Sequence, residues 1–128
     1  MPVIDINKIP SNEIPEPCRR WIKVIMTPET QNHIKDFSIT MGSIYPHRSN
    51  DLHTHEGYEL LYIVTGKGKA VLGDEIIEIG PDTLIIAPPG VPHQQINESD
   101  DMMKMFCMWN PAQTGNQVVG RAQNSNRL

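Results

Sequence analysis

The stretch HTHEGYELLYIVTG, residues 53–66, decides the fold of this chain. Two histidines one residue apart precede a glutamate, and an apolar run then closes on a glycine. Side chains of a β-strand alternate between the two faces of a sheet, so the odd-numbered residues here share one face. That face carries His53, His55, Glu59, Leu61 and Ile63. The pattern places three side chains that can bind a metal at the mouth of a strand whose inner face is otherwise apolar.

The opposite face of the same strand is also apolar. It carries Tyr58, Leu60, Tyr62 and Val64. A strand that is apolar on both faces is usually buried on both faces. One face can line a barrel interior, and the other then needs a second layer or a partner subunit. We therefore expect a homodimer.

Short strand-like segments follow one another from Phe37 onward. Glycine, proline and aspartate separate these segments, which read FSITMGSIY, LLYIVTG, KAVLG, EIIEIG, TLIIAPPG, HQQIN and MMKMFCMW. Several short strands at this spacing are typical of an all-β sandwich or barrel. The run Gly66-Lys67-Gly68 predicts a hairpin turn.

The chain divides into three expected parts. Residues 1–20 contain four prolines and form an N-terminal extended arm, with room for a short edge strand over residues 3–6. Residues 21–110 form the barrel. Residues 111–128 are polar and rich in Asn and Gln, so we expect a loose C-terminal tail with Val118 and Val119 as its only apolar anchor.

Composition limits the class of protein. The 128 residues suffice for one domain with one core, and 38% of them are hydrophobic. A net charge of −4 argues against binding to nucleic acid or to an anionic membrane, because both need a basic face. No apolar run approaches the roughly 18 to 20 residues that span a bilayer, and the start lacks the basic and apolar regions of a signal peptide. We expect a cytoplasmic protein in which Cys18 and Cys107 are free thiols.

An isolated pair of histidines is more often a structural feature of a strand end than a binding site. Here the pair has company, because Glu59 shares its face and His93 follows the stiff turn PPGVP before a later strand. Three imidazoles and one carboxylate form an open, mixed nitrogen and oxygen site of the kind that divalent transition metals occupy.

The spacing of these residues resembles the cupin family over about residues 37–110. The first cupin motif has HxH, three or four residues, Glu, six residues and Gly, and here it is matched by His53, His55, Glu59 and Gly66. The second motif ends in PxG, two residues, His, three residues and Asn, matched here by Pro88, Gly90, His93 and Asn97. Two positions depart from the pattern: the glycine six residues before the first histidine is His47 here, and Gly80 lies two residues further from PxG than is usual.

The resemblance implies a double-stranded β-helix, a jelly-roll barrel of two antiparallel sheets that is open at one end. It also implies that His53, His55, Glu59 and His93 bind one divalent metal inside the barrel. The ligand set suits Fe, Mn, Co, Ni or Zn, and the sequence does not choose among them.

The remaining candidates concern the cavity beside the metal. Burying an unpaired Lys104 would be costly, so we expect the alternate residues of the last strand, Met105, Cys107 and Trp109, to face inward and line a substrate pocket. His47 is a candidate catalytic proton donor, with an exposed loop histidine as the alternative. Arg48 is a candidate anchor for a substrate carboxylate, although solvation at the surface would explain it equally well.

Two functions compete. The first is a metal-dependent enzyme of the dioxygenase, isomerase, decarboxylase or lyase type that acts on a small polar molecule. The second is a non-catalytic ligand-binding sensor, because the run from residue 53 to residue 93 also resembles the sensor barrel of arabinose-type regulators, here without a DNA-binding domain.

Overall fold

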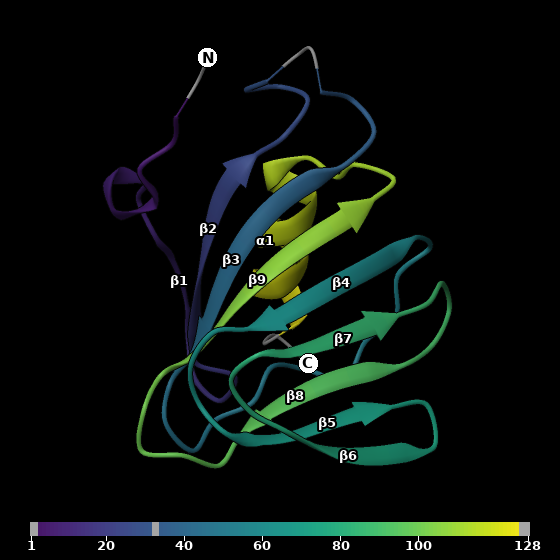
Figure 1. Ribbon diagram of the computed structural model, residues 1–128. Coiled ribbons are helices and arrows are strands. Elements are labelled where there is room, and N and C mark those ends of the chain that lie inside the picture. Colours follow the sequence, from purple (N-terminus) through teal and green to yellow (C-terminus); the bar gives the residue numbers. More distant parts are fainter. Residues whose placement is uncertain (1–2, 32–33, 126–128) are drawn as a thin grey trace.

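The computed structural model describes residues 3–31 and 34–125, and within them nine strands form two antiparallel sheets. The six-stranded sheet has the order β1-β2-β3-β9-β4-β7, and the three-stranded sheet has the order β6-β5-β8 (Figure 1). The strands are β1 (Asn12–Ile14), β2 (Arg20–Met26), β3 (Ser38–Ile44), β4 (Tyr58–Ile63), β5 (Gly68–Leu72), β6 (Glu75–Ile79), β7 (Thr83–Ala87), β8 (His93–Asn97) and β9 (Met103–Asn110). The expected all-β jelly roll is confirmed.

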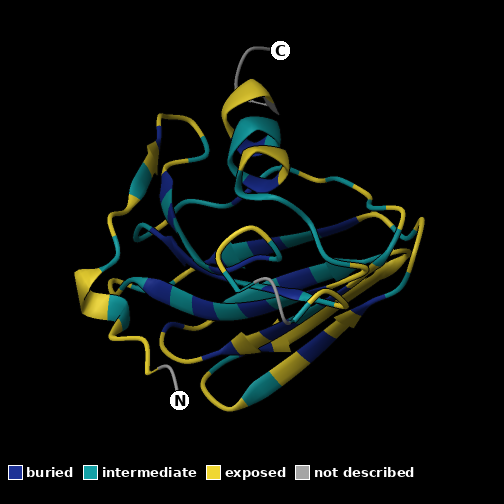
Figure 2. Ribbon diagram, turned by 90° about the horizontal axis from the view of Figure 1, so that it is seen from above, coloured by how far each residue is buried: buried dark blue, intermediate teal, exposed yellow. Residues whose placement is uncertain are grey.

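Alternation along the strands builds the core between the two sheets. In β9 the residues Met103, Met105, Cys107 and Trp109 are buried, and the residues between them are only partly covered. The inward orientation expected for this strand is therefore confirmed. Figure 2 shows the same alternation as bands of dark blue and lighter colour along the long strands.

The outer face of β4, for which we expected a second layer or a partner subunit, is exposed in the single chain. Its inner residues Glu59, Leu61 and Ile63 are buried, as alternation requires. On the other side, Tyr58 and Tyr62 keep 50% and 39% of their surface exposed. Within one chain the strand is thus buried on one face only, because no described element forms a second layer over the outer face of β4.

The glycines at 66 and 68 mark a crossover between the two sheets, and the expected hairpin turn is wrong. β4 pairs with β7 and β9, whereas β5 pairs with β6 and β8. The chain leaves one sheet and enters the other at this point, and here its backbone passes close to the backbone of neighbouring strands. Gly66 has φ 89, and a Cβ at Gly68 would lie 1.8 Å from the carbonyl oxygen of Ile96. Only glycine fits this crossing.

The N-terminal arm contains a short 3-10 helix, η1 (Ile6–Lys8), followed by β1. β1 pairs with β2 at the edge of the large sheet. The edge strand of the arm therefore lies at residues 12–14, and the strand expected over residues 3–6 is absent from the described residues. Residues 1 and 2 lie outside the described part of the chain.

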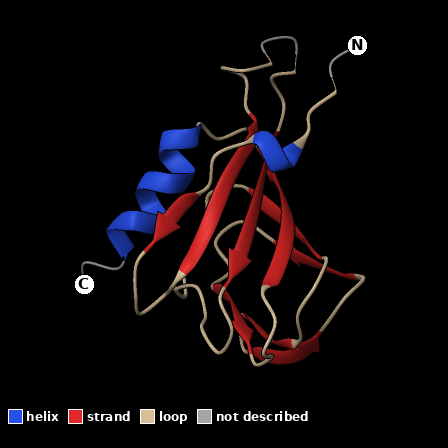
Figure 3. Cartoon of the chain, turned by 90° about the vertical axis from the view of Figure 1, so that its left-hand side faces the viewer, coloured by secondary structure: helices blue, strands red, loops and turns tan. Residues whose placement is uncertain are grey.

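The C-terminal segment forms a helix, α1 (Gly115–Ser125), where a loose tail was expected (Figure 3). Its start carries a capping box: Thr114 Oγ1 accepts from the Gln117 amide at 3.1 Å, and Gln117 Oε1 accepts from the Thr114 amide at 2.7 Å. Val118 and Ala122, one turn apart, are buried in the core. Within the described residues no helix is long and apolar enough to cross a membrane.

Candidate metal centre

The mouth of the barrel brings four candidate ligands together from two sheets. His53 forms an isolated bridge with His93, the first residue of β8, through backbone hydrogen bonds of 3.1 and 2.9 Å. Glu59 is the second residue of β4 and points inward. The carbonyl of His55 accepts from the Gly90 amide at 2.9 Å, which ties the loop before β4 to the turn before β8.

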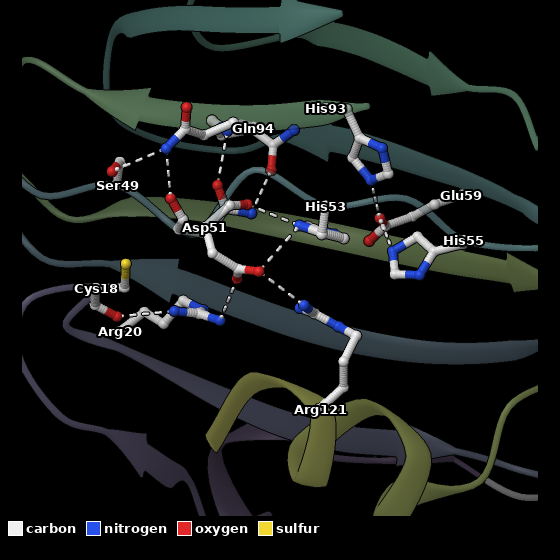
Figure 4. Close-up of polar contacts among 12 residues, drawn as sticks. Cys18, Arg20, Ser49, Asp51, His53, His55, Glu59, His93, Gln94 and Arg121 are labelled. Atoms are coloured by element: carbon white, nitrogen blue, oxygen red, sulfur yellow. Dashed lines mark hydrogen bonds and ion pairs between the residues drawn. The ribbon is translucent and has the colours of Figure 1, made fainter. Parts of the chain in front are cut away.

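One ligand atom from each of these four residues lies within 4.8 Å of the others. Glu59 Oε1 lies 3.0 Å from His93 Nε2 and 3.2 Å from His55 Nε2. The side chains of Glu59, His55 and His93 are at most 5% exposed. The cluster that the sequence spacing predicted therefore exists in space, with its members converging on one point (Figure 4).

Backbone carbonyls set the orientation of two of the rings. His53 Nδ1 lies 2.7 Å from the Asp51 carbonyl oxygen, and His93 Nδ1 lies 3.0 Å from the Val91 carbonyl oxygen. A carbonyl can only accept, so Nδ1 carries a proton in both rings, and Nε2 is the ring nitrogen left to face the centre of the cluster. This arrangement orients metal-binding histidines in many proteins.

The charges within the cluster keep its carboxylate ionised. Burial would raise the pKa of Glu59, but its close contacts with the rings of His55 and His93 lower it to about 2. Burial and the charge of Arg121 lower the pKa of His53 to about 4, so this ring is neutral at neutral pH. Burial would lower the pKa of His93, and its contact with Glu59 raises it instead. A metal would displace that proton when it takes the ring as a ligand.

The residues fit a divalent transition metal. His55 Nε2 is buried and has no hydrogen-bond partner among the described residues, although it lies near Glu59. A buried polar atom without a partner is costly, and a metal ion at the centre would satisfy it. Three imidazoles and one carboxylate would leave one or two positions open on a six-coordinate ion.

A cavity adjoins the cluster. Its empty volume is about 440 Å³, including the space at its open mouth. Met105, Cys107 and Trp109 line it, as the sequence predicted. Trp109 Nε1 donates to Thr40 Oγ1 at 3.0 Å. Burial, together with the neighbouring Glu59, raises the pKa of Cys107 well above its usual range, so this residue is a neutral thiol.

His47 and Arg48 lie away from this cavity and do not line it. His47 is 60% exposed and pairs with Asp100, and Arg48 pairs with Glu16. His47 has φ 59, the left-handed region that favours glycine, at the position where the cupin motif has its glycine. The residue thus occupies a turn position, and the structure does not bring it to the metal cluster.

The cavity also contains polar residues that the sequence analysis did not identify. They are Arg20, Asn50, Gln95 and Arg121, with Thr40 beside Trp109. Figure 4 shows Arg20 and Arg121 pointing toward Asp51 from β2 and from α1. The sequence could have identified Asp51, because it lies two residues before His53 and therefore on the same face of an extended strand. Arg121 could have been identified only if the C-terminal helix had been predicted.

The fold and the cluster define a small β-barrel protein with an internal ligand set suited to a divalent metal. The family model described as "Cupin domain" matches residues 41–109, and the chain belongs to the cupin family. The chain is 32% identical to an L-ectoine synthase of Aliivibrio fischeri (strain MJ11) over 99 residues, which cover 77% of this chain and 76% of that protein.

Solved structures show the same fold. The ectoine synthase from P. lautus matches with a TM-score of 0.77 and 22% identity, covering 94% of this chain and 86% of that one. A predicted oxalate decarboxylase from Thermotoga maritima also matches with a TM-score of 0.77, at 18% identity over 85% of this chain and 98% of that one. At these identities the likeness concerns the barrel itself.

Proposed function

We propose that this protein is a metal-dependent cupin enzyme that acts on a small polar molecule. His53, His55, Glu59 and His93 would hold one divalent transition metal. The convergence of their ligand atoms within 4.8 Å is the observation that carries the proposal, together with the buried His55 Nε2, which makes no hydrogen bond to any described residue. The bound ion would supply a Lewis acid that polarises a carbonyl or carboxylate oxygen of the substrate.

The chain's own residues would position the substrate and exclude water. Apolar walls from Leu61, Met105 and Trp109 close the cavity around its polar end. Because these apolar side chains exclude water, electrostatic interactions between the substrate and the polar residues of the cavity are stronger than they would be in water. The reaction is of the lyase, isomerase, decarboxylase or dioxygenase type. The 32% identity to L-ectoine synthase makes formation of L-ectoine the first reaction to assay.

A non-catalytic sensor is the second candidate. His47 lies at the surface and cannot serve as a proton donor in the cavity. Beside the histidines, the described cavity lining then offers only Glu59 and the neutral Cys107 for acid–base catalysis, which favours a non-catalytic role. An enzyme should lose turnover in Glu59→Gln while it keeps its fold. A sensor should show only a changed affinity for its ligand.

Free thiols at Cys18 and Cys107 also support a proposed location in the reducing cytoplasm.

Elemental analysis of protein purified without a metal-affinity tag tests the metal centre. We expect about one equivalent of a transition metal in the wild-type protein and a large loss in His93→Ala. His47→Gly is the matched control, because it removes an exposed histidine in a conformation that glycine adopts freely, and it should keep the metal. A wild-type protein that stays metal-free after incubation with Fe, Mn, Co, Ni and Zn would overturn the proposal.

A further inference from the structure

The cavity beside the cluster has an excess of positive charge. Arg20 and Arg121 both contact one carboxylate: Asp51 Oδ1 lies 3.2 Å from Arg20 and Oδ2 lies 2.9 Å from Arg121. The side chain of Arg20 is only 4% exposed. Asp51 does not itself line the cavity; Glu59 is the acid among the described lining residues, and the imidazoles already contact it. Among the described residues, two guanidinium groups contact one carboxylate, which leaves one positive charge without a counterion in contact with it.

The pKa of Arg20 agrees with this count. Burial lowers it, and the charge of Arg121 lowers it further, while Asp51 acts in the opposite direction. The net result is a pKa below the usual range for arginine, although an acid lies in direct contact. A buried cation in this position gains when a further anion arrives.

The same cavity contains a buried hydrogen-bond donor without a partner. Asn50 Oδ1 accepts from the backbone amide of Gln95 at 2.7 Å, which identifies the other terminal atom of Asn50 as its amide nitrogen. That nitrogen donates to Gln95 Oε1 at 2.9 Å. The remaining terminal atom of Gln95 is therefore Nε2, which is buried and has no partner in the described part of the chain.

We propose that this cavity recognises a small molecule through a carboxylate group, with Arg20, Arg121 and Gln95 as the carboxylate-binding residues. A carboxylate is planar and offers two acceptors, which suits the fork of an arginine and the free amide of Gln95 together. Ile22, Leu61 and Val118 would contact a short aliphatic part of the same molecule. The proposal deepens the proposed function, since it assigns the substrate class of the same site, and it replaces Arg48 as the expected anchor.

Binding of butyrate to zinc-loaded protein tests this inference, with butyramide as a neutral probe of nearly the same shape. Titration followed by nuclear magnetic resonance should shift the side-chain N–H signals of Arg121 and Gln95. We expect butyrate to bind at least tenfold more tightly than butyramide. Equal affinity for the two probes, or binding that leaves both signals unchanged, would overturn the proposal, and this readout needs no variant.

Variants then locate the anion. Arg121→Gln should weaken butyrate binding about tenfold, while Arg19→Gln, which removes an exposed arginine next to Arg20 in the sequence, should not change it. Weakening by Arg48→Gln in place of Arg121→Gln would overturn the assignment. Inorganic phosphate that binds more tightly than butyrate would overturn the choice of a carboxylate.

Repeating the titration on metal-free protein separates this inference from the proposed function. Butyrate that still shifts the Arg121 and Gln95 signals without zinc supports an arginine-based site, and it does so even if the protein proves unable to bind a metal. Butyrate whose binding disappears without zinc and is unaffected by Arg121→Gln is a ligand of the metal alone. That result would overturn the inference and leave the metal centre intact.

Discussion

At the scale of single residues, Asp51 connects the parts of the site. Its carboxylate contacts Arg20 on β2 and Arg121 on α1, and its backbone carbonyl accepts from the ring of His53. Burial would raise the pKa of Asp51, but Arg121, His53 and Arg20 lower it below the usual range for aspartate. One acid thus holds two cations and orients a candidate metal ligand.

We predict that Asp51→Asn lowers the free energy of unfolding of the metal-free protein by about 3 kcal/mol, because it leaves two guanidinium groups without their acid. Urea unfolding measures the change. A folded-state pKa below the unfolded value means that the carboxylate stabilises the fold above about pH 4 and that this contribution is lost as the pH falls through the folded-state pKa. The difference between the two proteins should therefore shrink in acid.

Asp100→Asn is the control for this prediction. Asp100 is also paired, with His47, but its side chain is 97% exposed. Exposed ion pairs contribute little to stability, so this variant should unfold at the same urea concentration as the wild-type protein. Equal unfolding midpoints for wild type and Asp51→Asn would contradict the role assigned to Asp51.

Residues that follow a strand period or a motif spacing could be predicted, and the arginines could not. His53, His55, Glu59 and His93 share a face or a motif, and the structure brings them together. That they bind a metal stays a prediction. Arg20 and Arg121 lie at the end of the expected arm and inside the expected tail. Their place in the cavity depends on tertiary contacts with Asp51, which no local pattern encodes.

At the scale of elements, α1 is the element that the sequence analysis did not predict. The segment GNQVVGRAQNS contains two glycines and two adjacent valines, and both residue types have low helix propensity. The helix forms because Thr114 and Gln117 cap its start and because Val118 and Ala122 bury one face against the barrel. Tertiary packing outweighs propensity here. The capping box was the available signal.

We predict that Gly120→Ala raises the free energy of unfolding by about 0.5 to 1 kcal/mol, since it removes backbone freedom from the unfolded chain. Beyond the helix backbone and adjacent residues, no described heavy atom lies within 4 Å of a Cβ at Gly120. The same substitution at Gly68 places its Cβ 1.8 Å from the Ile96 carbonyl oxygen and should abolish the native fold. Thermal unfolding and circular dichroism compare the two variants, and a Gly120→Ala protein with a lower melting temperature would contradict the prediction.

At the scale of the whole molecule, the outer face of the large sheet exposes apolar side chains that the single chain does not cover. Register places Tyr62 opposite Leu84 and Leu60 opposite Ile86 on β4 and β7. Leu84 and Ile86 are 55% and 50% exposed, and Ile86, Leu60 and Met108 line a surface pocket there. A contiguous apolar surface of this kind marks an interaction site on a globular protein. Alternation in the sequence predicted its apolar character, while its exposure follows because no second layer covers it among residues 3–31 and 34–125.

We propose that a second copy of the chain covers this face, which a two-fold axis would allow because the same patch then meets itself. Light scattering coupled to size-exclusion chromatography should give the mass of a dimer for the wild-type protein. Ile86→Lys should give a monomer, because it places a charge in the buried contact. Ile76→Lys is the control, since Ile76 is 69% exposed on β6 of the other sheet, and it should leave the dimer intact. A wild-type monomer at every concentration measured would contradict the proposal, and so would an Ile76→Lys monomer beside an Ile86→Lys dimer, which would place the interface on the smaller sheet.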